Sequence, residues 1–156
     1  MANIEGLMGG SGNDYLYGNS SSNYLSGGAG ADTLDGEGGN DFFFSGSGAD
    51  TITTGTGNDV VYFDASAFSG KDTISDFVTG QDVIDLTDVF TVDAASGKSL
   101  ANYVQVTVGG ELRVDVTGNS SFSAANAIAD LTFQTTGGVN ILYDDNTNPT
   151  DQNGVA

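Results

Sequence analysis

The sequence predicts an all-β protein: a parallel β-solenoid followed by a β-rich capping segment with hairpins. Three observations support this prediction: a nine-residue repeat over residues 9–62, one large apolar residue in each repeat, and alternation of apolar and polar residues in the second half. The chain of 156 residues has about the length of one domain.

The repeat consists of six units in register, and each unit divides into a turn and a strand. In order, the units read GGSGNDYLY, GNSSSNYLS, GGAGADTLD, GEGGNDFFF, SGSGADTIT and TGTGNDVVY. The first six residues are rich in glycine, which favours a tight turn, and the last three are β-formers. Because strand residues alternate between faces, the eighth residue of each unit is expected to point inward. These inward residues are Leu16, Leu25, Leu34, Phe43, Ile52 and Val61.

Two units make one coil, so each unit is expected to stack on the unit two places ahead, about 4.8 Å away. The sixth positions then form two rows, namely Asp14, Asp32 and Asp50, and Asn23, Asp41 and Asp59. Carboxylates this close repel one another unless a cation lies between them, and calcium accepts six to eight oxygen ligands, backbone carbonyls included. The formal charge of −18, from 21 acidic and 3 basic residues, also favours a bound cation.

Composition excludes several functions. The acidic charge argues against nucleic acid and anionic membranes as partners, and no apolar run approaches the length of a membrane span. Cysteine and histidine are absent, which excludes disulfides, thiolate chemistry and a Ser-His triad. We therefore expect a protein that is not an enzyme. Residues 1–8 lack the features of a signal peptide.

The pattern G-G-x-G-x-D-x-(large apolar)-x over residues 9–62 resembles the repeats-in-toxin (RTX) family, whose right-handed parallel β-roll binds calcium in its turns. The resemblance implies that one turn contributes its second and fourth carbonyls and its Asp. The turn one coil further contributes its first and third carbonyls and its Asp. The three sites implied are Gly10, Gly12 and Asp14 with Gly27, Ala29 and Asp32; Gly28, Gly30 and Asp32 with Ser45, Ser47 and Asp50; and Glu37, Gly39 and Asp41 with Thr54, Thr56 and Asp59. The other turn residues of the implied calcium-binding set are Gly36, Gly38, Gly46, Gly48, Gly55 and Gly57.

Unit 18–26 departs from the family pattern. It has Asn19, Ser21 and Asn23 where Gly, Gly and Asp are expected, so a site between it and unit 36–44 would lack one charge.

The period breaks after Tyr62, and residues 70–90 resemble the segment that closes the roll in RTX proteases, lipases and adhesins. Two interpretations remain open. The segment can form two short strands, DTISDF and DVIDL, with solvated aspartates. Alternatively, Asp72, Asp76 or Asp82 completes the calcium coordination of the last turns.

The rest of the chain predicts a β-rich cap. Residues 103–116 alternate around Gly109-Gly110, and residues 131–143 alternate around Gly137-Gly138, so two hairpins are expected. Residues 123–130 predict a short helix capped by Ser123. The expected organisation is a calcium-binding roll (1–62), a cap and secretion-target region (63–143) and a mobile tail (144–156).

The resemblance implies a calcium-dependent folding module at the C-terminal end of a protein exported by a type I secretion apparatus. The location would be extracellular or at the cell surface of a Gram-negative bacterium. Two alternatives remain. One is a structural or adhesive surface module, as in an S-layer or biofilm adhesin, that self-associates with calcium. The other is a non-catalytic C-terminal module of a secreted hydrolase. Ligand binding would need the outward aromatic residues Tyr15, Tyr17, Tyr24, Phe42, Phe44 and Tyr62, which we interpret instead as contacts of the cap.

Overall fold

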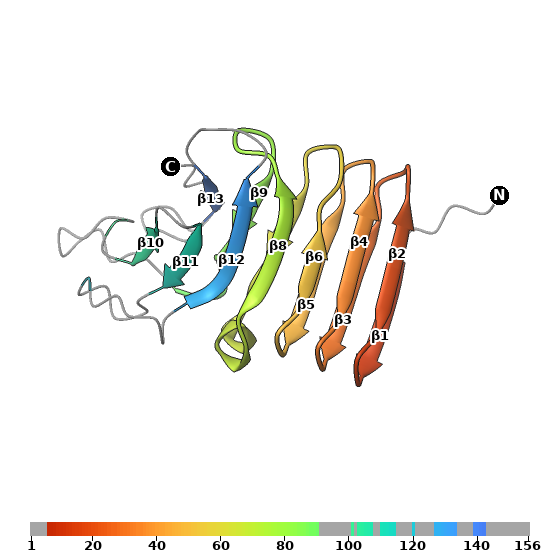
Figure 1. Ribbon diagram of the computed structural model, residues 1–156, viewed down its shortest axis with the longest axis horizontal. Helices are drawn as coiled ribbons and strands as arrows, with labels where there is room; N and C mark the ends of the chain where they lie inside the picture. Colours follow the sequence, from red (N-terminus) through yellow and green to blue (C-terminus); the bar gives the residue numbers. More distant parts are fainter. Residues whose placement is uncertain are drawn as a thin grey trace.

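The computed structural model describes residues 6–90, 101, 103–107, 110–114, 120, 127–133 and 139–142. The chain coils into two facing β-sheets, with successive strands of the repeat alternating between them. Figure 1 shows these strands following one another along the long axis, with the N-terminus at one end and β10–β13 at the other. The strands are β1 (Gly6–Ser11), β2 (Tyr15–Asn19), β3 (Tyr24–Ala29), β4 (Thr33–Glu37), β5 (Phe42–Ser47), β6 (Thr51–Thr53), β7 (Val60–Tyr62), β8 (Asp72–Phe77), β9 (Val83–Asp85), β10 (Val104–Val106), β11 (Glu111–Val114), β12 (Ala127–Phe133) and β13 (Asn140–Leu142).

The strand order confirms that two repeat units make one coil. One sheet has the order β1-β3-β5-β7-β9-β13, and the other has the order β10-β11-β12-β8-β6-β4-β2. Repeat strands pair in parallel with partners 18 residues apart, as Leu16 with Leu34 and Leu25 with Phe43. This register brings equivalent turn residues of neighbouring coils together, which creates the rows of acidic groups.

The eighth residue of every unit lies in the core between the sheets, as predicted. Leu25, Leu34, Phe43, Ile52 and Val61 have no exposed surface, and Leu16, in the first complete unit, is 7% exposed. The core continues past the repeats with Ile74, Phe77, Ile84 and Leu86, which are also fully buried. One apolar side chain from each strand of the six repeat units therefore fills the narrow interior.

The segment after Tyr62 continues the roll. A 3₁₀ helix, η1 (Ala65–Ser69), leads into β8, which pairs in parallel with β6, while β9 pairs in parallel with β7. The predicted strands DTISDF and DVIDL are thus present, and they occupy the positions of a further coil. Both sheets gain one more strand before the cap begins.

The hairpin predicted around Gly109-Gly110 is confirmed, since β10 and β11 pair antiparallel with Val104 opposite Val114. The second hairpin is wrong. β12 pairs antiparallel with β11 and in parallel with β8, whereas β13 belongs to the other sheet and pairs in parallel with β9. Alternation around two glycines suits a hairpin and also suits a chain that crosses from one sheet to the other, so the local pattern did not distinguish them.

The helix predicted over residues 123–130 is also wrong where the structure describes it, because residues 127–130 begin β12. The exposed edge of β8 needs a hydrogen-bonding partner, and Ile128 and Ala129 become fully buried there. This long-range gain outweighs a weak local helix preference. The predicted cap residue Ser123, Gly137-Gly138 and the predicted tail 144–156 lie outside the described residues.

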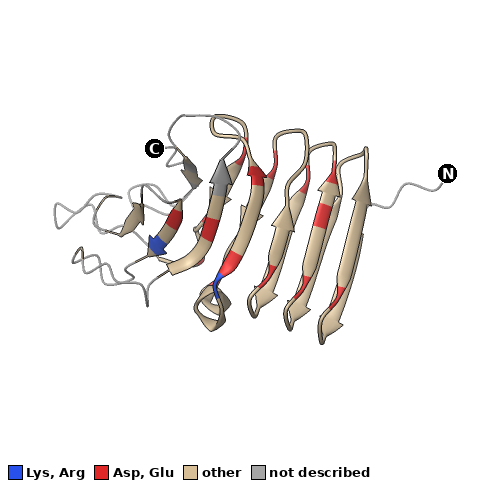
Figure 2. Cartoon of the chain, viewed as in Figure 1, with Lys and Arg blue, Asp and Glu red and all other residues tan. Residues whose placement is uncertain are grey.

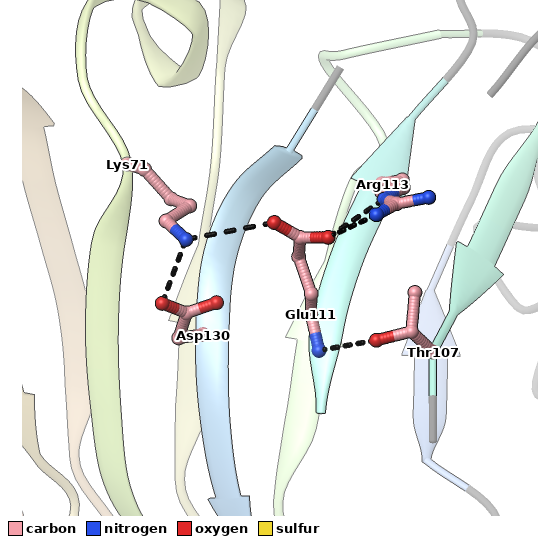
Figure 3. A network of polar contacts seen from close by, with 5 residues as sticks. All are labelled: Lys71, Thr107, Glu111, Arg113 and Asp130. Carbon is pink, nitrogen blue, oxygen red and sulfur yellow. Dashed lines mark hydrogen bonds and ion pairs between the residues drawn. The ribbon is translucent and has the colours of Figure 1, made fainter. Parts of the chain in front are cut away.

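Polar contacts join the cap to the roll, as Figure 3 shows. The Nζ atom of Lys71, at the entrance to β8, lies 2.8 Å from Asp130 on β12 and 3.5 Å from Glu111 on β11. Arg113 donates from Nε to Glu111 at 2.7 Å, and the Glu111 amide donates to Thr107. Because exposed ion pairs contribute little, the main stabilisation of the cap comes from buried residues such as Leu112, Val114 and Ile128.

Four of the outward aromatic residues contact one another along the sheet of β3, β5 and β7. The rings of Tyr24 and Phe42 are stacked at 5.4 Å between centroids, and Tyr62 contacts both Phe42 and Phe44. This stacking gives Phe42 and Phe44 partial cover, so aromatic partners on neighbouring coils take the place of the expected cap contacts. Within the described part of the chain, no helix is long and apolar enough to cross a membrane.

Candidate metal centre

The acidic turn residues form two hydrogen-bonded ladders. In each row, the backbone amide at the sixth position of a unit donates to Oδ1 of the aspartate one coil further on. In the first row these distances are 2.8 Å for Asp14 to Asp32, 2.8 Å for Asp32 to Asp50 and 2.9 Å for Asp50 to Asp72. In the second row they are 2.8 Å for Asn23 to Asp41, 2.8 Å for Asp41 to Asp59 and 3.1 Å for Asp59 to Asp82. Asp72 and Asp82 are therefore the last members of the two rows.

The aspartates before the last member of each row, here called the inner aspartates, have no hydrogen-bond partner for their second carboxylate oxygen, Oδ2, in four cases. Among the described residues, Oδ2 is buried and lacks a hydrogen bond in Asp32, Asp41, Asp50 and Asp59. Burying an ionised carboxylate oxygen without a partner costs several kcal/mol, and this cost is removed when a cation binds it. The four oxygens therefore indicate a cation between the coils.

The first glycine of each turn leaves space beside these oxygens. A Cβ atom at Gly27 would lie 2.4 Å from Oδ2 of Asp32 and 2.6 Å from the carbonyl oxygen of Ser45. A Cβ atom at Gly9 would lie 2.4 Å from the carbonyl oxygen of Gly27 and 2.6 Å from Oδ2 of Asp14. A carboxylate and a carbonyl from adjacent coils thus face one small space.

The turn of unit 36–44 repeats this arrangement in the second row. A Cβ atom at Gly36 would lie 2.4 Å from Oδ2 of Asp41 and 2.8 Å from the carbonyl oxygen of Thr54. A donor set made only of carboxylate and carbonyl oxygens fits calcium, which prefers hard oxygen ligands in a flexible geometry. The residues present therefore fit the ion.

The structure brings together the carboxylates and first-position carbonyls of the three predicted sites. The third-position carbonyls of Ala29, Ser47 and Thr56 accept amide hydrogen bonds from Gly12, Gly30 and Gly39 at 2.7–2.9 Å. Each of these carbonyls retains a second lone pair. These bonds align the turns of neighbouring coils, so each predicted site spans two coils.

Unit 18–26 has the same shape but different chemistry. A Cβ atom at Gly18 would lie 2.5 Å from Oδ1 of Asn23 and 2.8 Å from the Gly36 carbonyl oxygen. Oδ1 of Asn23 already accepts a hydrogen bond from the Asn19 amide at 2.8 Å, and an amide oxygen carries no full charge. This position is a weaker cation ligand than its aspartate equivalents.

Asp72 and Asp82 also differ from the inner aspartates. Oδ2 of Asp72 accepts from the Ser45 hydroxyl at 2.9 Å, and Oδ2 of Asp82 accepts from the Val78 amide at 2.7 Å. Asp76 belongs to neither row and lines an open pocket of about 500 Å³ with Asp35 and Glu37. Serine and threonine at the first position of a unit were the sequence signal for this difference, and the sequence analysis gave a role only to their carbonyls and none to their hydroxyls.

Burial raises the pKa of several carboxyl groups in the two rows. Desolvation raises the pKa of Asp59 to about 7, with smaller raising effects from the charges of Asp82 and Asp41, against the lowering effect of its hydrogen bond with the Asp41 amide. Desolvation likewise raises the pKa of Asp72 to about 7 and raises the pKa values of Asp41 and Asp50. The roll without metal therefore disfavours the charged form of these groups.

We predict that the calcium-free chain becomes more stable as pH falls from 8 to 5. The folded pKa of Asp59 and Asp72, about 7, lies above the ordinary value of 3.8, so the folded state binds more protons between these values. The stabilisation is lost as pH rises through 7 and is complete below about 4. Circular dichroism in chelator at the two pH values measures this effect as the fraction of folded chain, and less β-structure at pH 5 than at pH 8 would contradict it. In calcium the trend should reverse, because protons compete with the ion.

Two facing parallel sheets with acidic turns define this chain as a calcium-binding β-roll module. The family model for the RTX calcium-binding nonapeptide repeat matches residues 8–43 and 35–67, with four copies, so the match covers the repeat region. The predicted resemblance, fold class and calcium ion are confirmed. Figure 2 shows acidic residues along the described roll, with Lys and Arg only near its capped end.

Two solved structures from Azotobacter vinelandii share the fold. The R3 subunit of the AlgE6 mannuronan C5-epimerase is 24% identical with a TM-score of 0.55, and the match covers 100% of this chain and 94% of that chain. The R2 subunit of the same enzyme is 28% identical with a TM-score of 0.56, and the match covers 88% of this chain and 96% of that chain. No curated protein sequence matches the chain.

Proposed function

We propose that this chain is a module that folds on binding calcium and serves as the C-terminal folding and secretion region of a protein exported by type I secretion. The observation that carries the proposal is the set of four buried Asp oxygens without hydrogen-bond partners. A fold that buries such oxygens between its coils is disfavoured without a cation and favoured with one, so ion binding and folding are coupled.

Three calcium ions are proposed, at the sites that join Asp14 to Asp32, Asp32 to Asp50 and Asp41 to Asp59. Three ions of charge +2 would change the formal net charge from −18 to −12. Sites of the extracellular type bind calcium at about 10⁻⁴–10⁻³ M, and an ion present at 100 times its Kd adds about 2.7 kcal/mol. Three ions would thus supply much of a typical stability of about 5–15 kcal/mol.

The export role follows from this coupling. Without calcium, the self-repulsion of the acidic chain favours an extended state that a secretion channel can pass. In calcium outside the cell the roll folds onto its cap, and the location is extracellular. The division into a roll (1–62), a cap with the secretion target (63–143) and a tail (144–156) belongs to this proposal.

A calcium titration followed by circular dichroism tests the proposal. We expect little β-structure in chelator and cooperative folding at about millimolar calcium, with magnesium much less effective because it requires a rigid octahedral site. A chain that is fully folded in chelator would remove the switch. Export is tested separately by fusing the chain to a reporter and expressing it with and without a type I apparatus.

A second candidate is a non-catalytic module attached to a secreted enzyme, because the two similar structures described above are subunits of an epimerase. The isolated chain is then expected to have no catalytic activity of its own. The adhesive alternative predicts association of this module in calcium. Light scattering with and without calcium distinguishes these two, since an attached module stays monomeric in both conditions.

A further inference from the structure

The first position of the repeat changes identity toward the capped end of the roll. It is glycine in the first four units, at Gly9, Gly18, Gly27 and Gly36, and it becomes Ser45 and Thr54 in the last two. A Cβ atom at any of these glycines would lie beside the side-chain oxygen of the sixth-position Asp or Asn and a backbone carbonyl. Ser45 and Thr54 carry a real Cβ at that position, and both are almost completely buried.

In the first row, hydrogen bonds satisfy both carboxylate oxygens of Asp72, the last member. The Asp50 amide donates to Oδ1 of Asp72, and the Ser45 hydroxyl donates to Oδ2, so both carboxylate oxygens have partners. The Ser66 hydroxyl of η1 donates to the Gly46 carbonyl at 2.8 Å. One of the carbonyls of the implied ligand set thus already accepts from a protein donor.

In the second row, the step from Asp59 to Asp82 is held in the same way. The Asp59 amide donates to Oδ1 of Asp82, and the Val78 amide donates to Oδ2. Thr54 holds the first position of the last unit in this row, and its hydroxyl donates to the Ser75 carbonyl at 3.3 Å.

The two ends of the roll therefore differ in what faces the acidic oxygens. Asp32, Asp41, Asp50 and Asp59 each keep one buried oxygen without a partner, whereas both oxygens of Asp72 and Asp82 accept from amides or hydroxyls. Hydroxyl and amide donors can replace a cation only where they reach the same oxygens. The Ser45 hydroxyl and the Val78 amide are such donors, one at the last step of each row.

We propose that Ser45 and Thr54 end the two calcium rows, so that Asp72 and Asp82 close the ladders without binding calcium. Hydrogen bonds then hold the last coil against the roll, and the junction with the cap forms independently of the ion. The junction gives calcium-driven folding a preformed edge on which the roll can grow. This inference rests on the proposed binding of calcium between the earlier coils.

Calcium stoichiometry in the whole chain, measured by equilibrium dialysis, tests the inference. Asp72→Asn and Asp82→Asn are expected to bind as many ions as the wild type, with dissociation constants within twofold. Asp32→Asn, the matched change in the middle of a row, is expected to lose two ions. Loss of one ion by Asp72→Asn or by Asp82→Asn would overturn the inference and leave the proposed function intact.

A second measurement does not depend on the folding of any variant. In crystals of the wild type grown in calcium, anomalous scattering should show ions between Asp14 and Asp32, Asp32 and Asp50, and Asp41 and Asp59. An ion between Asp50 and Asp72, or between Asp59 and Asp82, would overturn the inference alone. A wild type that binds no calcium would overturn both the inference and the proposed function.

Discussion

Replacing Asp32 with asparagine is expected to remove two of the three calcium ions and about 5 kcal/mol of stability in saturating calcium. Asp32 belongs to two of the proposed sites, and each ion present at 100 times its Kd contributes about 2.7 kcal/mol. Asparagine keeps the size of the side chain and the Oδ1 atom that accepts from the Asp14 amide. The substitution therefore removes the charge and little else.

The same variant should behave differently in chelator. Oδ2 of Asp32 is buried without a partner, so a neutral side chain is expected to leave the calcium-free chain at least as stable as the wild type. Urea unfolding in calcium measures the first effect, and the amount of β-structure in chelator, followed by circular dichroism, measures the second.

Asp35→Asn is the matched control for Asp32→Asn. Asp35 lies in the same unit, accepts from the Glu37 amide through Oδ1, and carries the same charge outside the rows. It should lose no ion. An equal loss of stability from the two variants would mean that overall charge, and not ion binding in the turns, decides the result.

Replacing Gly48 with alanine is expected to destabilise the calcium-bound roll by more than about 4 kcal/mol. A Cβ at Gly48 would lie 1.8 Å from the carbonyl oxygen of Gly30 and 2.7 Å from its carbonyl carbon, so two backbones must separate. The positive φ of 135° adds conformational strain. Because neighbouring coils share the turn hydrogen bonds, the separation should also weaken the ion sites on either side.

Gly12→Ala separates the effect of backbone strain on stability from the effect of a steric clash between coils. Gly12 has a φ of 114°, yet no atom of the described residues lies within 4 Å of a Cβ placed there. The Gly12→Ala variant should therefore lose only the stability that corresponds to backbone strain, about 1–3 kcal/mol. Chemical unfolding of the two variants in calcium measures the difference, and equal losses would contradict close stacking of the coils.

The periodic part of the fold was predictable because its information is local and repeated. A nine-residue period with one inward residue per strand determines the register, since a slip of one residue would expose the whole apolar ladder. Spacing alone predicts that Leu25 and Phe43 point inward. It also predicts the outward direction of six aromatic residues and the two rows of acidic residues. The oxygen chemistry of the turns then indicated calcium.

The irregular part was decided by long-range contacts. Residues 127–133 have weak local preferences, and they form a strand because the edge of β8 lacks a partner and Ile128 gains burial there. The contacts of Lys71 with Asp130 and Glu111 likewise join segments about 40–60 residues apart in the chain.

The sequence by itself determined the coil, its core and the rows of carboxylates, because each of these repeats at a constant spacing. Only the tertiary structure decided how the rows end. Whether Asp72 faces a cation or a hydroxyl depends on the position of Ser45, 27 residues earlier, one coil below. Such a contact depends on the stacking of whole coils, and no pattern within a single unit records it.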